Sequence, residues 1–173
     1  MKYSEDQLKE MAKPASDSEE SRMNNATKMV KDALVSNGII ADREFEVFAQ
    51  GSYANNTCVR GDSDVDIAIV REDTTEYTQG QSFLTSNPKI IEAKAFKNAV
   101  ERALKYYFYG DIQRKNKSIL VKGNTYRKQA DAVPCMSTRH ASTVYSSYDK
   151  YGVVIYADDG SIIYNFPKHH IEN

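Results

Sequence analysis

Two aspartates stand two residues apart at the start of a segment with the composition of a strand. Residues 64–70 read DVDIAIV, and β-branched residues dominate after the second carboxylate. Side chains alternate between the faces of a strand, so Asp64 and Asp66 are expected on one face and Val65 and Ile67 on the other. The pattern predicts two carboxylates side by side on a sheet whose other face is buried.

Neighbouring carboxylates repel each other, and this raises their pKa values unless a cation lies between them. Their oxygens suit Mg²⁺ or Mn²⁺ and not zinc. Two such ions can hold a transferring phosphoryl group, one activating the attacking hydroxyl and the other binding the triphosphate. Gly51 and Ser52, which break the preceding strand pattern, are suited to hold phosphate oxygens, because a glycine lets the backbone approach closely.

A third carboxylate for such a centre is predicted at Asp131. It is the only charge in the strand-like segment 130–135, which reads ADAVPC. An acid among small apolar residues costs free energy unless it has a partner. If this strand lies beside the first, Asp131 completes the site. It can then take the proton of the attacking hydroxyl or bind the metal that lowers the pKa of that hydroxyl.

Two other interpretations of the acidic pair compete with a metal centre. Residues 62–66 begin like a calcium-binding loop, but that loop requires glycine where Ile67 stands and glutamate where Asp73 stands. The calcium loop is therefore excluded. The second interpretation, that Asp64 and Asp66 are solvated strand residues, would be preferred for the pair alone. It loses most of its weight beside Gly51-Ser52 and Asp131.

Periodic patterns predict the elements that position these residues. Residues 4–37 are expected to be helical, with Pro14 separating two helices and Gly38 ending the second. Another helix is expected over 89–109. Strands are expected at 44–50, 64–70, 118–122, 129–135, 141–148, 152–156 and 161–165, with a short helix over 53–57 and a polar surface segment over 72–88. These patterns predict one domain of helices and strands.

Composition narrows the class of protein further. The chain has 173 residues, of which 40% are hydrophobic and 27% charged, as in a globular domain with a real core. Its net charge of −1 gives no whole-chain case for binding a membrane or a nucleic-acid template. No long apolar run or signal peptide is visible, so a cytoplasmic protein is expected.

The motifs together resemble a known family. Gly51-Ser52 followed by DVD at 64–66 resembles the signature of the DNA polymerase β-like nucleotidyltransferase superfamily. Within it, the stretch GSYANNTCVRGDSDVDIAIV is similar to the bacterial cGAS/DncV-like nucleotidyltransferases (CD-NTases) of anti-phage CBASS systems. ADAVPC resembles the strand of that family that carries the third aspartate. IIYNFPKH at 162–169 resembles the Asn/Tyr-Pro-Lys-x-His segment that follows in the family. The resemblance covers most of the chain from Val47 onward.

The resemblance implies an α+β polymerase β-like core with a mixed central sheet and flanking helices. It implies an enzyme that joins ATP or other NTPs into a cyclic oligonucleotide second messenger and releases pyrophosphate, with CBASS effector and accessory proteins as partners. By motif position, the metal ligands and catalytic residues would be Asp64, Asp66 and Asp131, holding two Mg²⁺ or Mn²⁺ ions. Gly51 and Ser52 would contact the triphosphate, and Gln50 and Asn56 would line the nucleotide pocket.

One departure from the family bears on activity. Family members continue past the Pro-Lys-x-His segment into a C-terminal helical domain, whereas this sequence stops at Asn173. Residues 1–173 are therefore expected to be a catalytic core without that domain, with weak or absent synthesis. Two alternatives remain open: a minimal nucleotidyltransferase that transfers AMP to a partner protein, as antitoxins do, and a non-catalytic nucleotide-binding fragment.

Overall fold

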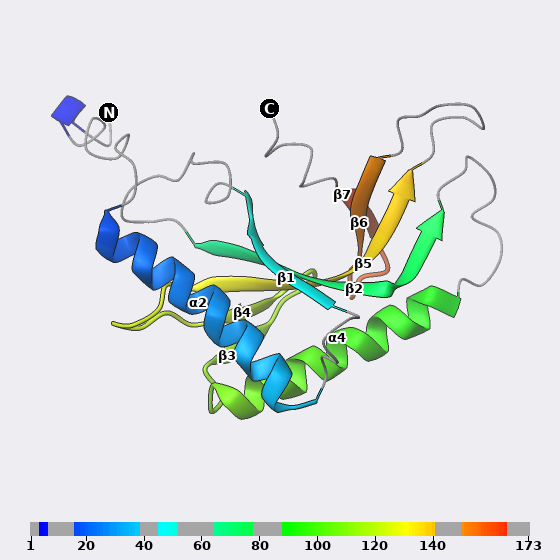
Figure 1. Cartoon of the computed structure of the whole chain (residues 1–173), viewed down its shortest axis with the longest axis horizontal. Helices are drawn as coiled ribbons and strands as arrows, with labels where there is room; N and C mark the ends of the chain where they lie inside the picture. The colour runs from blue at the N-terminus through cyan, green and yellow to red at the C-terminus, as the bar shows by residue number, and fades with distance from the viewer. Residues whose placement is uncertain are drawn as a thin grey trace.

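The computed structural model describes residues 4–6, 16–38, 45–51, 64–77, 88–140 and 150–165. Two predicted nucleotide contacts, Ser52 and Asn56, lie outside these residues, as do the predicted short helix over 53–57 and the predicted strand over 141–148. The described elements form an α+β fold in which two long helices pack on a mixed sheet (Figure 1). The expected fold class is confirmed.

Seven strands of the described residues form one sheet. They are β1 (Phe45–Gln50), β2 (Val65–Tyr77), β3 (Ile112–Arg114), β4 (Ile119–Val121), β5 (Ala130–His140), β6 (Lys150–Tyr156) and β7 (Ile162–Asn165). The order is β1-β2-β5-β4-β3, and β6 pairs with β5 and β7. Only the central pair β2 and β5 is parallel among these strands; the other described pairs are antiparallel. The predicted adjacency of the two aspartate-bearing strands is confirmed.

Helices α2 (Asp17–Ser36) and α4 (Pro88–Tyr107) cover one face of this sheet. The side chain of Ser16 caps α2 by accepting from the Glu19 amide, and the Glu19 carboxylate accepts from the Ser16 amide in return. Gly38 follows the helix with a φ of +65°, the left-handed conformation predicted for this glycine. Capping thus fixes both ends of α2.

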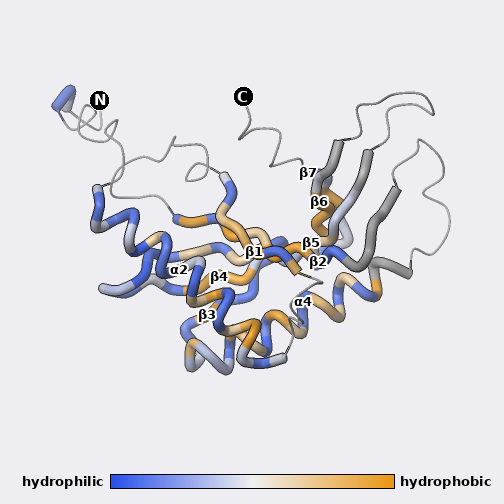
Figure 2. The backbone as a smooth tube through the Cα atoms, viewed as in Figure 1, coloured by the Kyte–Doolittle hydropathy of each residue, from blue (hydrophilic) through white to orange (hydrophobic). Residues whose placement is uncertain are grey.

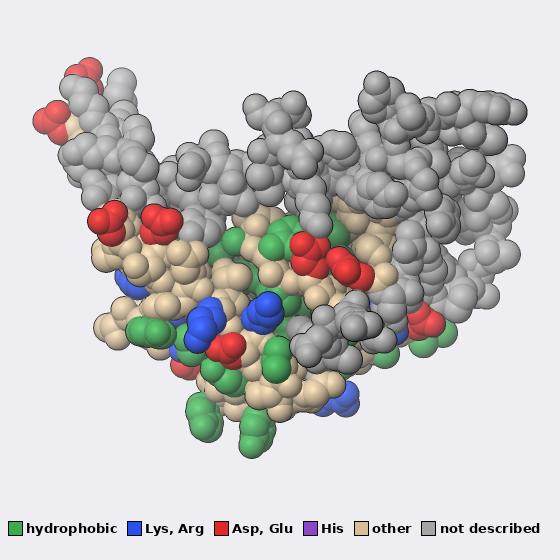
Figure 3. All heavy atoms as spheres, in the orientation of Figure 1, with side chains coloured by type: hydrophobic (Ala, Val, Ile, Leu, Met, Phe, Trp, Pro, Cys, Tyr) green, Lys and Arg blue, Asp and Glu red, His purple; other side chains and the backbone are tan. Residues whose placement is uncertain are grey.

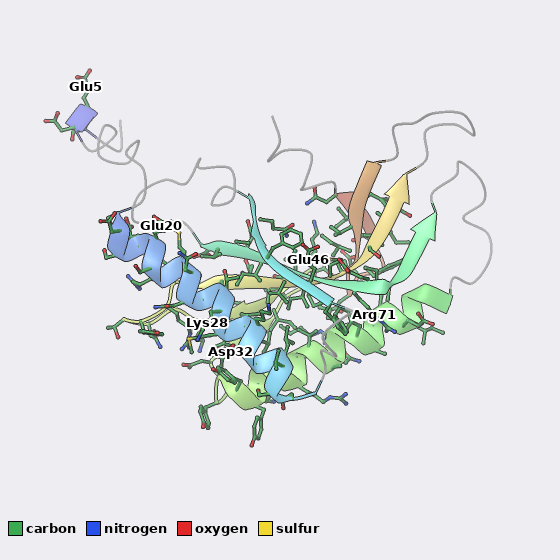
Figure 4. All side chains as sticks on the ribbon, viewed as in Figure 1. Glu5, Glu20, Lys28, Asp32, Glu46 and Arg71 are labelled. Atoms are coloured by element: carbon green, nitrogen blue, oxygen red, sulfur yellow. The ribbon has the colours of Figure 1, made fainter. Side chains whose placement is uncertain are left out.

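The main core lies between the helices and the sheet, where Figure 2 shows hydrophobic residues on both sides of the interface. Val30 and Leu34 of α2 and Val100 and Leu104 of α4 are fully buried there against strand residues such as Ile67. The opposite side of α2 is polar: the labelled Glu20, Lys28 and Asp32 extend from it in Figure 4. Among the described residues, neither helix has the length and apolar character needed to cross a membrane.

The boundaries of several strands differ from the predicted ones. β2 continues to Tyr77, although residues 72–88 were expected to form a polar surface segment. Its extension pairs with β5 after a shift of register between Arg71 and Glu76, and this pairing satisfies backbone groups that the polar sequence alone does not reveal. β5 likewise runs on to His140. β3 was missed, because three residues are too few to show a period.

Candidate active site

Four strands place one residue each in a single line across the sheet. Gln50 of β1 pairs with Asp66 of β2, Asp66 pairs with Asp131 of β5, and Asp131 pairs with Leu120 of β4. Residues opposite one another in a ladder point to the same face, so these four side chains form a line that we call the aspartate row. Ile67, the next residue on β2, packs in the helix-covered core. Because side chains alternate along a strand, Asp66 points to the opposite face. The aspartate row therefore lies on the face away from the helices.

Gly51 brings the backbone directly against the second aspartate. Its φ is +74°, and a Cβ atom added there would lie 2.5 Å from the Asp66 Oδ2 atom. Only glycine fits this position without a shift, for reasons of both backbone conformation and space. Gln50, just before it, is buried, and its Oε1 atom has no hydrogen-bond partner within the described part of the chain. The end of β1 thus places an unpaired side-chain oxygen, Gln50 Oε1, and the Gly51 backbone beside Asp66.

The Asp66 carboxylate is in an unfavourable place for a charge. Burial raises its pKa first, and the nearby Asp131 and Asp64 carboxylates raise it further, while Lys115 acts in the opposite direction. Of the described residues, none donates a hydrogen bond to this carboxylate. A cation bound beside Asp66 would relieve this repulsion.

The Asp131 carboxylate has partners instead. Lys115 Nζ lies 3.0 Å from its Oδ2 atom and 3.0 Å from its Oδ1 atom. Ser118 Oγ donates to Oδ1 over 3.0 Å. Both partners flank the hairpin turn 115–118 between β3 and β4. The Asp131 carboxylate is therefore paired with the Lys115 ammonium group and hydrogen-bonded by Ser118, both from the turn between β3 and β4.

The first aspartate, Asp64, precedes β2 and is exposed. Gln129 Nε2 donates to its Oδ2 atom over 2.9 Å. Within the described part of the chain, no three His, Cys, Asp or Glu side chains converge as a metal-binding group. The two flanking carboxylates instead face partners of their own. The sequence predicted all three carboxylates in one region, and in the structure Asp64 and Asp131 have hydrogen-bond partners of their own.

The donor set nevertheless suits a hard divalent cation. Asp64, Asp66, Asp131 and the free Gln50 Oε1 atom all offer oxygen, as Mg²⁺ and Mn²⁺ prefer. The raised pKa of Asp66 also indicates a surplus of negative charge that a cation would compensate. These residues fit the ions in chemistry and in strand position.

Sequence reasoning missed Lys115 and Ser118. Their contact with Asp131 depends on β4 pairing with β5, with Ile119 opposite Ala132. The only signal in the sequence was a short polar stretch, KNKS at 115–118, between two apolar segments. Such a stretch predicts a turn but not what the turn faces.

A group of charged residues, Lys97, Glu101, Arg114 and Asp158, holds this turn in place; we call it the clamp cluster. The buried Lys97 Nζ donates to the carbonyls of Lys115 over 2.9 Å and Asn116 over 2.6 Å, and to Asp158 Oδ2 over 3.0 Å. Arg114 forms a two-bond ion pair with Asp158 and also binds Glu101. The Arg114 guanidinium lowers the pKa of Asp158 to about 2. The clamp cluster joins α4 and the β6–β7 turn to the turn that carries Lys115.

On the face drawn in Figure 3, the described Lys and Arg side chains are scattered between acidic and neutral ones. They do not gather into a single basic surface in that view. Among the described residues, Lys115 is a charged side chain in direct contact with the aspartate row, through Asp131.

Comparison with known proteins matches this geometry to a family. The nucleotidyltransferase domain family matches residues 28–135, which include Gln50, Gly51 and all three aspartates. Over its whole length the chain is 36% identical to the cyclic GMP-AMP synthase CdnE03 of Staphylococcus schleiferi. Over 99% of its length it is 38% identical to the cyclic dipyrimidine nucleotide synthase CdnE of Cecembia lonarensis. The chain is a CD-NTase family member.

Solved structures agree with this CD-NTase assignment. A CdnE cyclic dinucleotide synthase of Elizabethkingia meningoseptica, solved with GTP and Apcpp, superposes with a TM-score of 0.75 at 34% identity. The match covers 98% of this chain and 57% of that one. The chain likewise spans 63% and 59% of the two synthases above. It thus corresponds to about three fifths of each relative, the part that contains the nucleotidyltransferase domain.

Proposed function

We propose that this CD-NTase core takes part in joining NTPs into a cyclic oligonucleotide, with release of pyrophosphate. The observation that carries the proposal is the pairing of Asp66 with Asp131 in register on adjacent parallel strands. Relatives named as cyclic nucleotide synthases match this chain over nearly its whole length, which includes that pair. In the reaction, a ribose hydroxyl oxygen forms a bond to an α-phosphorus while the bond to pyrophosphate breaks, and the hydroxyl proton is lost.

Each residue of the site has a proposed task in that reaction. Asp64, Asp66 and Asp131 hold two Mg²⁺ or Mn²⁺ ions, which supply charge neutralisation of the triphosphate and a lowered pKa for the attacking hydroxyl. Gly51 and Ser52 contact the triphosphate through the backbone and a hydroxyl. Gln50 offers its free Oε1 atom to a donor of the bound nucleotide or to a metal ion.

The setting of the reaction is proposed from the family. Because its motifs resemble the CD-NTases of anti-phage CBASS systems, an effector that responds to the product is the proposed partner. Residues 1–173 are proposed to act as the nucleotidyltransferase core of the protein.

The test is a turnover assay with radiolabelled NTPs and Mg²⁺, with and without lysate protein. The wild-type chain is compared with Asp64→Ala and Asp66→Ala variants of matched thermal stability. Nuclease-resistant cyclic products that disappear in both variants support the proposal. Labelled protein in place of cyclic products would instead identify AMP transfer to a partner. Nucleotide binding without turnover of any kind would identify a non-catalytic module.

A further inference from the structure

The hairpin turn 115–118 places one positively charged side chain, that of Lys115, against the aspartate row. Lys115 Nζ is equidistant, at 3.0 Å, from the two Asp131 oxygens, which is how a cation straddles a carboxylate. The Lys115 side chain is 40% exposed and the Asp131 side chain 22%, so the pair sits at the rim of the site where an ion can reach it. Asp66, one strand away, has no such cation among the described residues.

The placement of Lys115 is imposed by the surrounding fold. Its own backbone is held twice: the Lys115 amide donates to the Ser118 carbonyl over 2.9 Å, and the Lys115 carbonyl accepts from Lys97. Lys97 is only 3% exposed and cannot leave without stranding its partners. These contacts hold the Lys115 backbone, whereas the ammonium group, at the end of a long side chain, contacts only Asp131 among the described residues. This is the arrangement expected of a displaceable counter-ion.

We propose that Lys115 is a resident counter-ion that competes with the divalent metal for Asp131. In the metal-free protein it balances the charge of this carboxylate and keeps it apart from Asp66 and Asp64. Loading of the metal requires Asp131 to exchange the Lys115 ammonium for the ion. Lys115 is thus a positioning residue that sets how tightly the site binds metal. This inference rests on the proposed role of Asp131 as a metal ligand.

The competition predicts the direction of the mutational effect. Replacing Lys115 by Met removes the competing charge and keeps the length of the side chain. At the exposed rim of the site, where the effective dielectric constant is close to that of water, a unit charge about 6 Å from a divalent cation is worth about tenfold in its affinity. Lys115→Met is therefore expected to bind Mn²⁺ about tenfold more tightly than the wild-type chain. Lys115→Arg, which keeps the charge, is expected to stay near the wild-type affinity.

The measurement is the dissociation constant of free Mn²⁺ without nucleotide, followed by electron paramagnetic resonance. Lys117→Met is the matched control, because Lys117 is an exposed lysine in the same turn and removes the same charge from the chain. Its Mn²⁺ affinity is expected to change less than about twofold. Thermal unfolding supplies a second readout: added Mn²⁺ should raise the Tm of Lys115→Met more than that of the wild type.

The possible results separate this inference from the proposed function. Weakened Mn²⁺ binding in Asp131→Asn, together with tightened binding in Lys115→Met, supports both. Weakened binding in Asp131→Asn with unchanged or weaker binding in Lys115→Met overturns the competition and leaves the metal site standing. Unchanged Mn²⁺ binding in Asp131→Asn removes Asp131 from the metal site and overturns both.

Discussion

Two aspartates that are neighbours in one row of the sheet have opposite surroundings. On the β2 side, Asp66 lies against the Gly51 backbone, half-buried and repelled by two other carboxylates. On the β5 side, Asp131 accepts hydrogen bonds from Lys115 and Ser118. The two side chains differ in what the fold supplies to them rather than in their chemistry.

The difference shows that a fold can leave one carboxylate without a compensating charge and stabilise the carboxylate on the next strand. A raised carboxylate pKa means that folding disfavours the charged form. Asp66 therefore costs the metal-free protein stability at neutral pH. The β5 side offsets this with the ion pair of Lys115 and with the clamp cluster below it.

Asp66→Asn is expected to have the largest effect of any single change to the row. If Asp66 holds metal at the reacting phosphate as proposed, its loss should reduce the proposed cyclic-product formation by about 10³-fold or more. The same change should raise the stability of the metal-free protein at pH 7, because it removes a charge whose burial, with repulsion from Asp131 and Asp64, raises the Asp66 pKa. Turnover assays and thermal unfolding with a chelator measure the two effects.

The pH dependence of that gain checks its cause. The folded-state pKa of Asp66 is raised above its ordinary value, so its unfavourable contribution appears as pH rises through that pKa and vanishes in acid. The difference in Tm between Asp66→Asn and wild type should accordingly shrink as pH falls toward 4. A Tm difference that is independent of pH would mean that the buried charge of Asp66 is not what destabilises the metal-free protein.

Lys97→Met breaks the other side of the comparison. It strands two backbone carbonyls and part of the Asp158 carboxylate around an almost fully buried position. The expected loss is about 3 kcal/mol in the free energy of unfolding. Urea unfolding measures it, and Lys94→Met, an exposed lysine one turn earlier on α4, should change stability by less than about 0.5 kcal/mol. Equal losses in the two variants would show that the clamp cluster does not hold the turn.

Gly51→Ala probes the close contact on the β2 side. The alanine Cβ atom meets Asp66 Oδ2 at 2.5 Å and also strains a backbone with φ of +74°. Together these should cost about 2 kcal/mol and displace the Asp66 carboxylate. Gly38→Ala is the matched control: φ there is +65° and nothing lies within 4 Å, so only the backbone cost of about 1 kcal/mol remains. Product formation should fall in Gly51→Ala alone; equal behaviour of the two would make the Asp66 contact irrelevant.

The sequence predicted the β2 side of this comparison better than the β5 side. Asp64, Asp66 and Gly51 are separated by few residues, and strand alternation alone orients the carboxylates. Asp131 was predicted as a lone charge in an apolar strand, and its neighbour in the sheet is as expected. Its partner Lys115 could not be predicted, because that contact requires the register of β4 against β5. Long-range pairing also decided the true lengths of β2 and β5, which composition underestimated.

Asp158→Asn should give the smallest effect and tests whether the clamp cluster is electrostatic. The folded-state pKa of Asp158 is about 2, below its ordinary value, so its contribution is present above pH 4 and is lost as pH falls toward 2. About a third of the side chain is exposed, and water already screens it, so the loss at pH 7 should be only about 1 kcal/mol. Urea unfolding of wild type and variant at pH 7 and pH 2.5 measures the difference, which should fall to about a third at the lower pH, because a pKa of about 2 leaves part of Asp158 ionised there. A difference as large at pH 2.5 as at pH 7 would mean that Asp158 acts through packing and neutral hydrogen bonds.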